Sequence, residues 1–152
     1  MPEPTTAVVT GAGRGIGLEI ARQLAAAGHR VLLTDVDGDA AERAATEVGR
    51  GAWSARHDVR DPSVHRDVAA KASAVGRLKV WVNNAGMLIA GDSWSHTDAE
   101  IASILDVNVR GVVATLKHGA SGLVEGGLIV VTASLHVWRA APAQAAYTAS
   151  KH

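Results

Sequence analysis

The chain has 152 residues, of which 47% are hydrophobic and 20% are charged, and its formal net charge is zero. This length and composition indicate one globular domain with a sizeable core. The lack of cysteine excludes disulfides and thiol catalysis. The balanced charge favours neither a nucleic-acid partner nor a membrane surface.

No signal-peptide pattern and no apolar stretch of bilayer length occurs in the sequence, so we expect a cytoplasmic protein. The seven histidines show no metal-ligand spacing. We therefore expect no metal site, and we expect the histidines to be scattered at the surface or at edges.

Short apolar runs alternate with alanine-rich helical runs along the chain. Strands are expected at about 7–10, 30–35, 52–57, 78–83 and 128–132. Helices are expected at about 15–27, 39–48, 62–75, 98–116 and from about 143 onward. Ile16, Ile20 and Leu24 share one apolar stripe of the first helix. Continuous apolar strands separated by helices predict a doubly wound α/β fold with a parallel sheet.

A glycine-rich turn, residues 10–17, lies between the first strand and the first helix. Gly11 and Gly15 permit a tight turn and the close approach of a pyrophosphate, and Gly17 permits close packing of the helix on the strand. The helix N-terminus offers free N–H groups and a partial positive charge to phosphates. The turn therefore favours nucleotide binding over the alternative, in which the glycines serve only the turn's conformation.

Asp35 ends the second strand, where a carboxylate can accept hydrogen bonds from both ribose hydroxyls of an adenosine. A 2′-phosphate at ~4 Å would be repelled by about 4 kcal/mol per charge pair at an effective dielectric constant near 20. Asp35 thus favours NAD over NADP, although Arg14 in the turn argues mildly for NADP. In the alternative interpretation, Asp35 only forms a turn with Asp37 and Gly38.

Tyr147, the single tyrosine of the chain, precedes Lys151 by four residues. On a helix, residues four apart lie on one face, so the ammonium would favour the phenolate. A phenol of this kind can act as a general acid and base near neutral pH. The alternative is that the two residues are unrelated neighbours on the surface.

These features together resemble the short-chain dehydrogenase/reductase family. Further matches follow in the family's order: Asp58-Val59, Asn83-Asn84-Ala85-Gly86, Asn108 and Ser134. The resemblance spans essentially the whole chain. It implies a cofactor site made of Gly11, Arg14, Gly15, Ile16, Gly17, Asp35, Asp58, Val59, Asn84, Ala85, Gly86, Tyr147 and Lys151.

The resemblance implies an NAD-dependent oxidoreductase that interconverts an alcohol and a carbonyl by hydride transfer. Tyr147 would exchange a proton with the substrate oxygen, and Lys151 would assist it and bind the nicotinamide ribose. Ser134 would hydrogen-bond the same oxygen, and Asn108 would help to order a water. As alternatives, Ser134 could cap a turn and Asn108 could be a buried polar group bonded to backbone. Asn84 is expected to brace the fourth strand.

Family members normally continue beyond Lys151 with another strand and a segment that covers the substrate. We therefore expect residues 1–152 to be a single NAD-binding, Rossmann-like domain from a longer chain. Its five strands would lie in the order 3-2-1-4-5, with the fifth exposed at the edge. The resemblance implies a small alcohol or ketone as substrate and a homo-oligomer for the full-length parent. It leaves open a non-catalytic dinucleotide-binding module.

Overall fold

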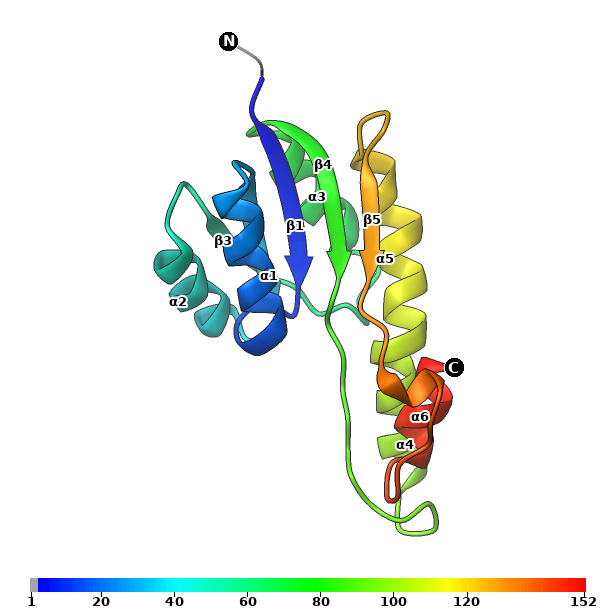
Figure 1. Cartoon of the computed structure of the whole chain (residues 1–152). Helices are drawn as coiled ribbons and strands as arrows, with labels where there is room; N and C mark the ends of the chain where they lie inside the picture. Colours follow the sequence, from blue (N-terminus) through cyan, green and yellow to red (C-terminus); the bar gives the residue numbers. More distant parts are fainter. Residues whose placement is uncertain (1–2) are drawn as a thin grey trace.

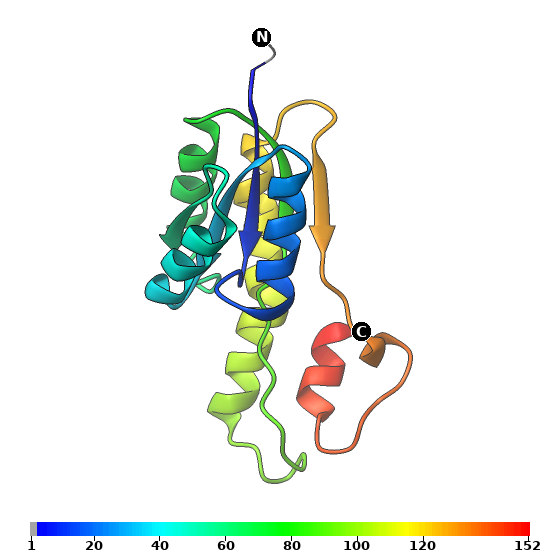
Figure 2. The same ribbon diagram turned by 60° about the vertical axis from the view of Figure 1, so that its left-hand side comes forward.

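Five parallel strands form one sheet in the order β3-β2-β1-β4-β5, with helices on both faces (Figures 1 and 2). The computed structural model describes residues 3–152. The strand bounds are β1 Thr5–Thr10, β2 Arg30–Asp35, β3 Trp53–Arg56, β4 Arg77–Asn83 and β5 Leu128–Val131. The arrangement confirms the predicted doubly wound α/β fold and its strand order.

Helices connect the strands and extend beyond their carboxyl ends. The main helices are α1 Gly15–Ala26, α2 Gly38–Val48, α3 His65–Ser73, α4 Asp98–Leu105, α5 Val112–Gly119 and α6 Ala145–Lys151. Three shorter elements are the π-helix η1 Asp106–Gly111 and the 3₁₀ helices η2 Ala120–Gly122 and η3 Leu135–Val137. Figure 1 places α4 and α6 below the carboxyl edge of the sheet, so residues 84–97 and the segment after β5 converge there.

Two cores form because successive strand residues point to opposite faces of the sheet. Ala7 and Val9 of β1 are fully buried in the core under α1 and α2. Val8 lies on the other face with Leu32 and Trp81, packed against α3. All five side chains are almost completely buried, which explains why the strands have nearly continuous apolar sequences.

Strand β5 lies at one edge of the sheet and, among the described strands, pairs with β4 alone. Its four residues are all exposed, from 37% at Ile129 to 56% at Leu128. In Figure 2, β5 lies at the right-hand edge of the sheet, and no helix lies in front of it. The predicted exposed edge strand is therefore present.

Helix α3 begins at His65 instead of near Pro62, so the predicted helix over 62–75 is too long. The preceding residues form a local turn. The Asp61 carboxylate accepts hydrogen bonds from the backbone N–H of Ser63 at 2.9 Å and from its hydroxyl at 2.7 Å. Such side-chain bonds to nearby backbone compete with the helix and delay its start.

The predicted helix over 98–116 is interrupted by the π-helix of residues 106–111. Its start is fixed by a capping box, in which Thr97 accepts from the Glu100 amide and Glu100 accepts from the Thr97 amide. At Gly111, a Cβ atom would lie 2.9 Å from Val59 Cγ2. The wider turn therefore coincides with close packing of the helix on the loop after β3.

The segment after β4 is irregular and ends at the capping box of α4. Its Gly91 amide donates to the carbonyl of Ala143 at 2.8 Å, which joins it to the loop before α6. Helix α6 begins at Ala145, close to the predicted start. Within residues 3–152, no helix is both long enough and apolar enough to cross a membrane.

Candidate functional site

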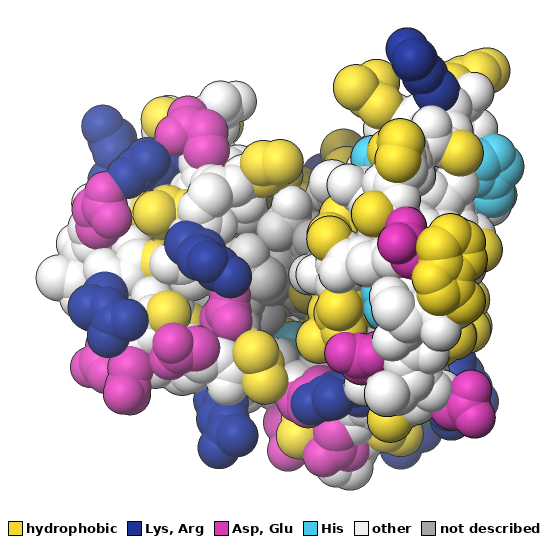
Figure 3. Space-filling view, turned by 90° about the horizontal axis from the view of Figure 1, so that it is seen from below, with side chains coloured by type: hydrophobic (Ala, Val, Ile, Leu, Met, Phe, Trp, Pro, Cys, Tyr) yellow, Lys and Arg dark blue, Asp and Glu magenta, His cyan; other side chains and the backbone are white. Residues whose placement is uncertain are grey.

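A cavity of about 430 Å³ opens at the carboxyl ends of the strands. Figure 3, viewed from that side, shows a hollow between two lobes of the molecule. The strand order reverses between β1 and β4, the position at which open α/β sheets bind ligands. The predicted cofactor residues that line the cavity are Gly11, Arg14, Asp35, Asp58, Val59, Asn84, Ala85 and Gly86.

The glycine-rich turn has a backbone that few other residues could adopt. Gly11 has φ +62°, and a Cβ atom there would lie 2.7 Å from the Ala85 Cα. Gly15 has φ +58°, and no described atom lies within 4 Å of a Cβ placed on it. A Cβ on Gly17 would collide with the Gly11 carbonyl and lie 2.6 Å from Asn84 Nδ2. The sequence analysis expected Gly17 to permit close packing of the helix on the strand. In the structure, the close contacts that Gly17 permits are with the Gly11 carbonyl in the turn and with Asn84.

The first turn of α1 is open to solvent. Arg14 is its N-cap in an extended conformation, and within the described residues neither a capping side chain nor an acidic first-turn residue occupies this end. The first N–H groups are thus available to an anion. Ile16 is 67% exposed, so the expected apolar stripe is wrong at this position. Ile20 and Leu24 pack on the core, whereas Ile16 lies in the first turn of α1, just beyond the carboxyl end of the central strand β1.

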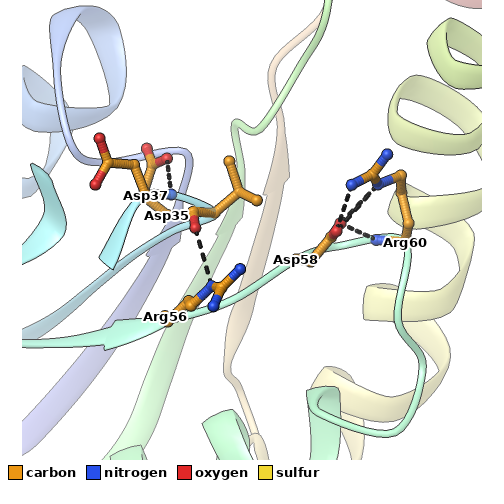
Figure 4. Close-up of polar contacts among 6 residues, drawn as sticks. Asp35, Asp37, Arg56, Asp58 and Arg60 are labelled. Atoms are coloured by element: carbon orange, nitrogen blue, oxygen red, sulfur yellow. Dashed lines mark hydrogen bonds and ion pairs between the residues drawn. The ribbon is translucent and has the colours of Figure 1, made fainter. Parts of the chain in front are cut away.

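Asp35 is held beside the turn by two backbone amides. One carboxylate oxygen accepts from Gly13 N–H at 3.0 Å and the other from Asp37 N–H at 3.1 Å. Figure 4 shows the bond from Asp37 and the neighbouring bond from Arg56 Nε to the Val36 carbonyl, which is 3.2 Å long. Asp35 thus makes the turn-forming bond of the alternative interpretation and also lines the cavity.

Asp58 is bound to Arg60, a residue that the sequence analysis did not single out (Figure 4). Its carboxylate accepts from the Arg60 backbone at 3.0 Å, from Nε at 2.9 Å and from Nη2 at 2.6 Å. These bonds hold the pKa of Asp58 below its usual range. The intervening Val59 is buried against Gly111. The only sequence signal for this pair is that Asp58 and Arg60 are oppositely charged and two residues apart.

Two histidines beside the cavity are buried, so the expectation that the histidines lie at the surface or at edges is wrong for these two. His57 is 3% exposed and His65 is completely buried. His57 Nδ1 lies 3.1 Å from Thr34 Oγ1, and its Nε2 lies 2.8 Å from His65 Nδ1. His65 stacks on His118 with 6.1 Å between ring centroids. No group of three or more potential metal ligands forms within residues 3–152.

Thr10 and Asn84 tie the ends of three strands together. The Thr10 hydroxyl oxygen accepts from the backbone amides of Asn84 at 3.1 Å and Ala85 at 3.0 Å. Asn84 Nδ2 donates to the Thr10 and Gly11 carbonyls, each at 3.1 Å. Its Oδ1 accepts from the Thr132 hydroxyl at 3.3 Å. These bonds fix the turn against β4 and β5, and no sequence signal pointed to Thr10.

Asn108 lies in the π-helix with 5% of its surface exposed. Its Oδ1 accepts from the Met87 amide at 2.7 Å, and its Nδ2 donates to the Met87 carbonyl at 2.8 Å. The same Nδ2 donates to Ser150 Oγ at 2.9 Å, and Ser150 donates to the Tyr147 carbonyl at 2.7 Å. Asn108 therefore joins η1, the loop after β4 and helix α6, which is the geometry of a buried polar group bonded to backbone.

Tyr147 and Lys151 lie on the same face of α6. Lys151 Nζ is 5.9 Å from the centroid of the Tyr147 ring and donates to the Thr132 carbonyl at 3.1 Å. It also lies 3.8 Å from a Cβ placed on Gly86, which lines the cavity. Burial lowers the pKa of Lys151 from its ordinary value. The amine is therefore placed between the cavity and the phenol.

Ser134 follows β5 and caps η3. Its Oγ accepts from the His136 amide at 3.2 Å and lies 2.9 Å from His136 Nδ1. The His136 ring meets the Tyr147 ring edge-on, with 5.2 Å between centroids and 85° between planes. Ser134 therefore forms the cap of the alternative interpretation and, through His136, is connected to the face of α6 that carries Tyr147.

The geometry fits a dinucleotide. The positive φ angles and close contacts of the turn require glycine, so no side chain covers its backbone at these positions. Space also remains beside Gly15. The uncapped end of α1 can receive phosphates, and the Asp35 carboxylate lies at the end of β2 beside the same cavity. Fold and site together define a Rossmann-like nucleotide-binding domain.

The sequence profile of the short chain dehydrogenases matches residues 5–152. The chain belongs to the short-chain dehydrogenase/reductase family. It is 34% identical to a 3-beta-hydroxysteroid dehydrogenase of Comamonas testosteroni over 95% of this chain and 58% of that protein. The chain thus spans little more than half the length of this curated relative.

Solved structures of the family are similar throughout the chain. A short chain dehydrogenase/reductase from Burkholderia phymatum, crystallised with NAD, has a TM-score of 0.92 and 30% identity over 99% of this chain and 56% of its own. A short chain dehydrogenase from Burkholderia cenocepacia, crystallised with NADP, has a TM-score of 0.88 and 38% identity over 97% of this chain and 62% of its own.

Proposed function

We propose that this chain forms the cofactor site and the proton-transfer residues of an NAD-dependent oxidoreductase that interconverts an alcohol and a carbonyl. The observation that carries the proposal is the position of Lys151. Its Nζ lies beside Gly86 of the cavity and 5.9 Å from the centre of the Tyr147 ring. One cation can therefore serve both a dinucleotide in the cavity and the phenol.

Asp35 supports NAD over NADP. Its two oxygens are fixed by backbone amides of Gly13 and Asp37, so the carboxylate cannot easily turn away from the cavity. Remaining lone pairs can accept ribose hydroxyls, whereas a 2′-phosphate would bring like charge to the same place. The two structural relatives were crystallised one with NAD and one with NADP, so Asp35 is the residue on which this choice rests.

When bound, the nicotinamide dinucleotide supplies or accepts the hydride. The Tyr147 phenol gives a proton to the substrate oxygen in carbonyl reduction and takes it back in alcohol oxidation. Lys151 stabilises the phenolate, and its partial burial strengthens this attraction because water screens it less. The Ser134 hydroxyl holds the same substrate oxygen and stabilises the charge that develops on it.

A second candidate is a dinucleotide-binding module without turnover. It is favoured by one observation: Ser134, Tyr147 and Lys151 are not among the residues that line the cavity. In this case the chain binds NADH but does not oxidise alcohols. The two candidates therefore differ in turnover and agree in binding.

The test is NADH formation from NAD and a panel of secondary alcohols, with NADH binding measured in parallel. Where turnover occurs, Tyr147→Phe should lower kcat by roughly 10²–10⁴ while NADH still binds. His29→Asn, which changes a residue that contacts Thr5 away from the cavity, is the matched control. Binding without turnover would support the second candidate, and turnover unaffected by Tyr147→Phe would contradict the role of the phenol.

A further inference from the structure

His136 contacts two of the proposed site residues, although the proposed chemistry gives it no role. Its Nδ1 is 2.9 Å from Ser134 Oγ, and its backbone amide donates to the same oxygen at 3.2 Å. Its ring packs edge-on against the Tyr147 ring at 5.2 Å. A single imidazole thus lies between the hydroxyl and the phenol that would hold the substrate oxygen.

The position of this imidazole is restricted by its surroundings. Its Nε2 is buried and, within the part of the chain that the structure describes, has no hydrogen-bond partner. Nδ1 is therefore the ring nitrogen that makes the specific polar contact. Ser134 fixes that contact because it caps η3 in an extended conformation, which places Oγ over the next two residues.

The hydrogen on Nδ1 determines what Ser134 can offer to a ligand. A serine has one hydroxyl hydrogen. If Nδ1 carries no hydrogen, Ser134 donates to it, and Oγ can only accept a hydrogen bond, as from an alcohol. If Nδ1 carries a hydrogen, it donates to Oγ, and the Ser134 hydrogen is free to bond a carbonyl oxygen.

We propose that His136 is a positioning residue, which directs the Ser134 hydroxyl hydrogen toward or away from the substrate oxygen and holds the ring of Tyr147. The proposal rests on the proposed function, because it assigns His136 to the same reaction. Carbonyl binding requires the state in which Nδ1 donates, and alcohol binding suits the state in which Nδ1 accepts. His136 acts through Ser134 and does not itself contact the reacting atoms.

The first experiment uses the free protein. The nitrogen chemical shifts of the His136 ring, measured by NMR, distinguish a protonated Nδ1 from a bare one. We expect Ser134→Ala to change the Nδ1 shift of His136 and to leave the ring of His29 unchanged. An Nδ1 shift that does not respond to Ser134→Ala would show that the contact does not exist in solution, and it would overturn the proposal.

The second experiment uses three substitutions of one residue. Asparagine places an amide where Nδ1 was, glutamine places it near Nε2, and leucine offers no polar atom. We expect His136→Leu and His136→Gln to lower kcat/KM on the order of tenfold, as for the loss of one orienting hydrogen bond, and His136→Asn to restore most of it. Both reaction directions should fall together, because no substitution changes the overall equilibrium.

The outcomes separate this proposal from the one on which it rests. If the chain turns over and the leucine variant keeps its kcat/KM, or the asparagine variant is as slow as the leucine variant, the positioning role is wrong and the proposed function stands. If the wild type binds NADH without turnover, the proposed oxidoreductase function fails and the substrate role of His136 fails with it. Cofactor affinity should be unchanged in all three variants, since His136 is not among the residues that line the cavity.

Discussion

Replacing His57 by asparagine should make the stability of the protein less sensitive to acid. His57 is 3% exposed and bonds to Thr34 and His65. Burial and, to a smaller extent, the proximity of His65 lower the pKa of His57 from 6.5 to about 4, although Asp58 and Asp61 oppose the shift. The folded state therefore favours the neutral imidazole.

The direction in which stability changes with pH follows from the lowered pKa of His57. The unfolded chain binds a proton near pH 6.5, whereas the folded chain resists it until about pH 4. The contribution of His57 to stability is complete above pH 6.5 and is lost as the pH falls toward 4. At about 1.36 kcal/mol per pH unit, the shift corresponds to about 3 kcal/mol of unfolding free energy.

The assay is urea unfolding at a series of pH values, followed by tryptophan fluorescence, to which the buried Trp81 contributes. Between pH 6.5 and 4 the wild type should lose about 3 kcal/mol more than His57→Asn, whatever the variant loses at neutral pH. Equal pH dependence of the wild type and His57→Asn would refute the reasoning.

Two further substitutions test the packing of the glycine-rich turn. Gly17→Ala places a Cβ 2.6 Å from Asn84 Nδ2, and we expect a loss of about 1–3 kcal/mol in urea unfolding together with loss of NADH binding. Thr10→Val keeps the shape but leaves the amides of Asn84 and Ala85 without their acceptor. We expect it to cost about 1–3 kcal/mol, and a variant as stable as the wild type would contradict the bonding described here.

The central strands were predictable because they are buried on both faces and show this as nearly uninterrupted apolar runs. Ala7 to Val9 and Val31 to Leu33 are completely buried in the sheet. The glycine-rich turn was recognisable for a related reason. Its backbone conformation and close contacts admit only glycine at Gly11 and Gly17, so the structural requirement appears directly in the sequence.

Other features depend on contacts between distant segments, which sequence periodicity does not report. The π-helix changes the phase of a helix whose apolar pattern continues through it. Histidine is common both at the surface and in cores, so the burial of His57 and His65 follows only from the packing of α3 against the sheet and α5. The contacts of His136 with Ser134 and Tyr147 likewise require the position of α6 beside η3.

In helix α1, the predicted apolar stripe packs against the core at two of its three positions. Ile20 and Leu24 follow the expected spacing and pack on the core. Ile16 has the same spacing but is 67% exposed, because the first turn of the helix lies just beyond the carboxyl end of the central strand β1.

The most direct test is a calorimetric titration of the wild type and Asp35→Asn with NADH and with NADPH. Saturable NADH binding that is tighter than NADPH binding is the predicted result. Asp35→Asn should weaken NADH binding by on the order of tenfold, because charge-assisted bonds to the ribose are lost. It should also reduce the difference in affinity between NADH and NADPH. Absence of saturable NADH binding, or a preference for NADPH in the wild type, would contradict the assignment of this cavity as an NAD site.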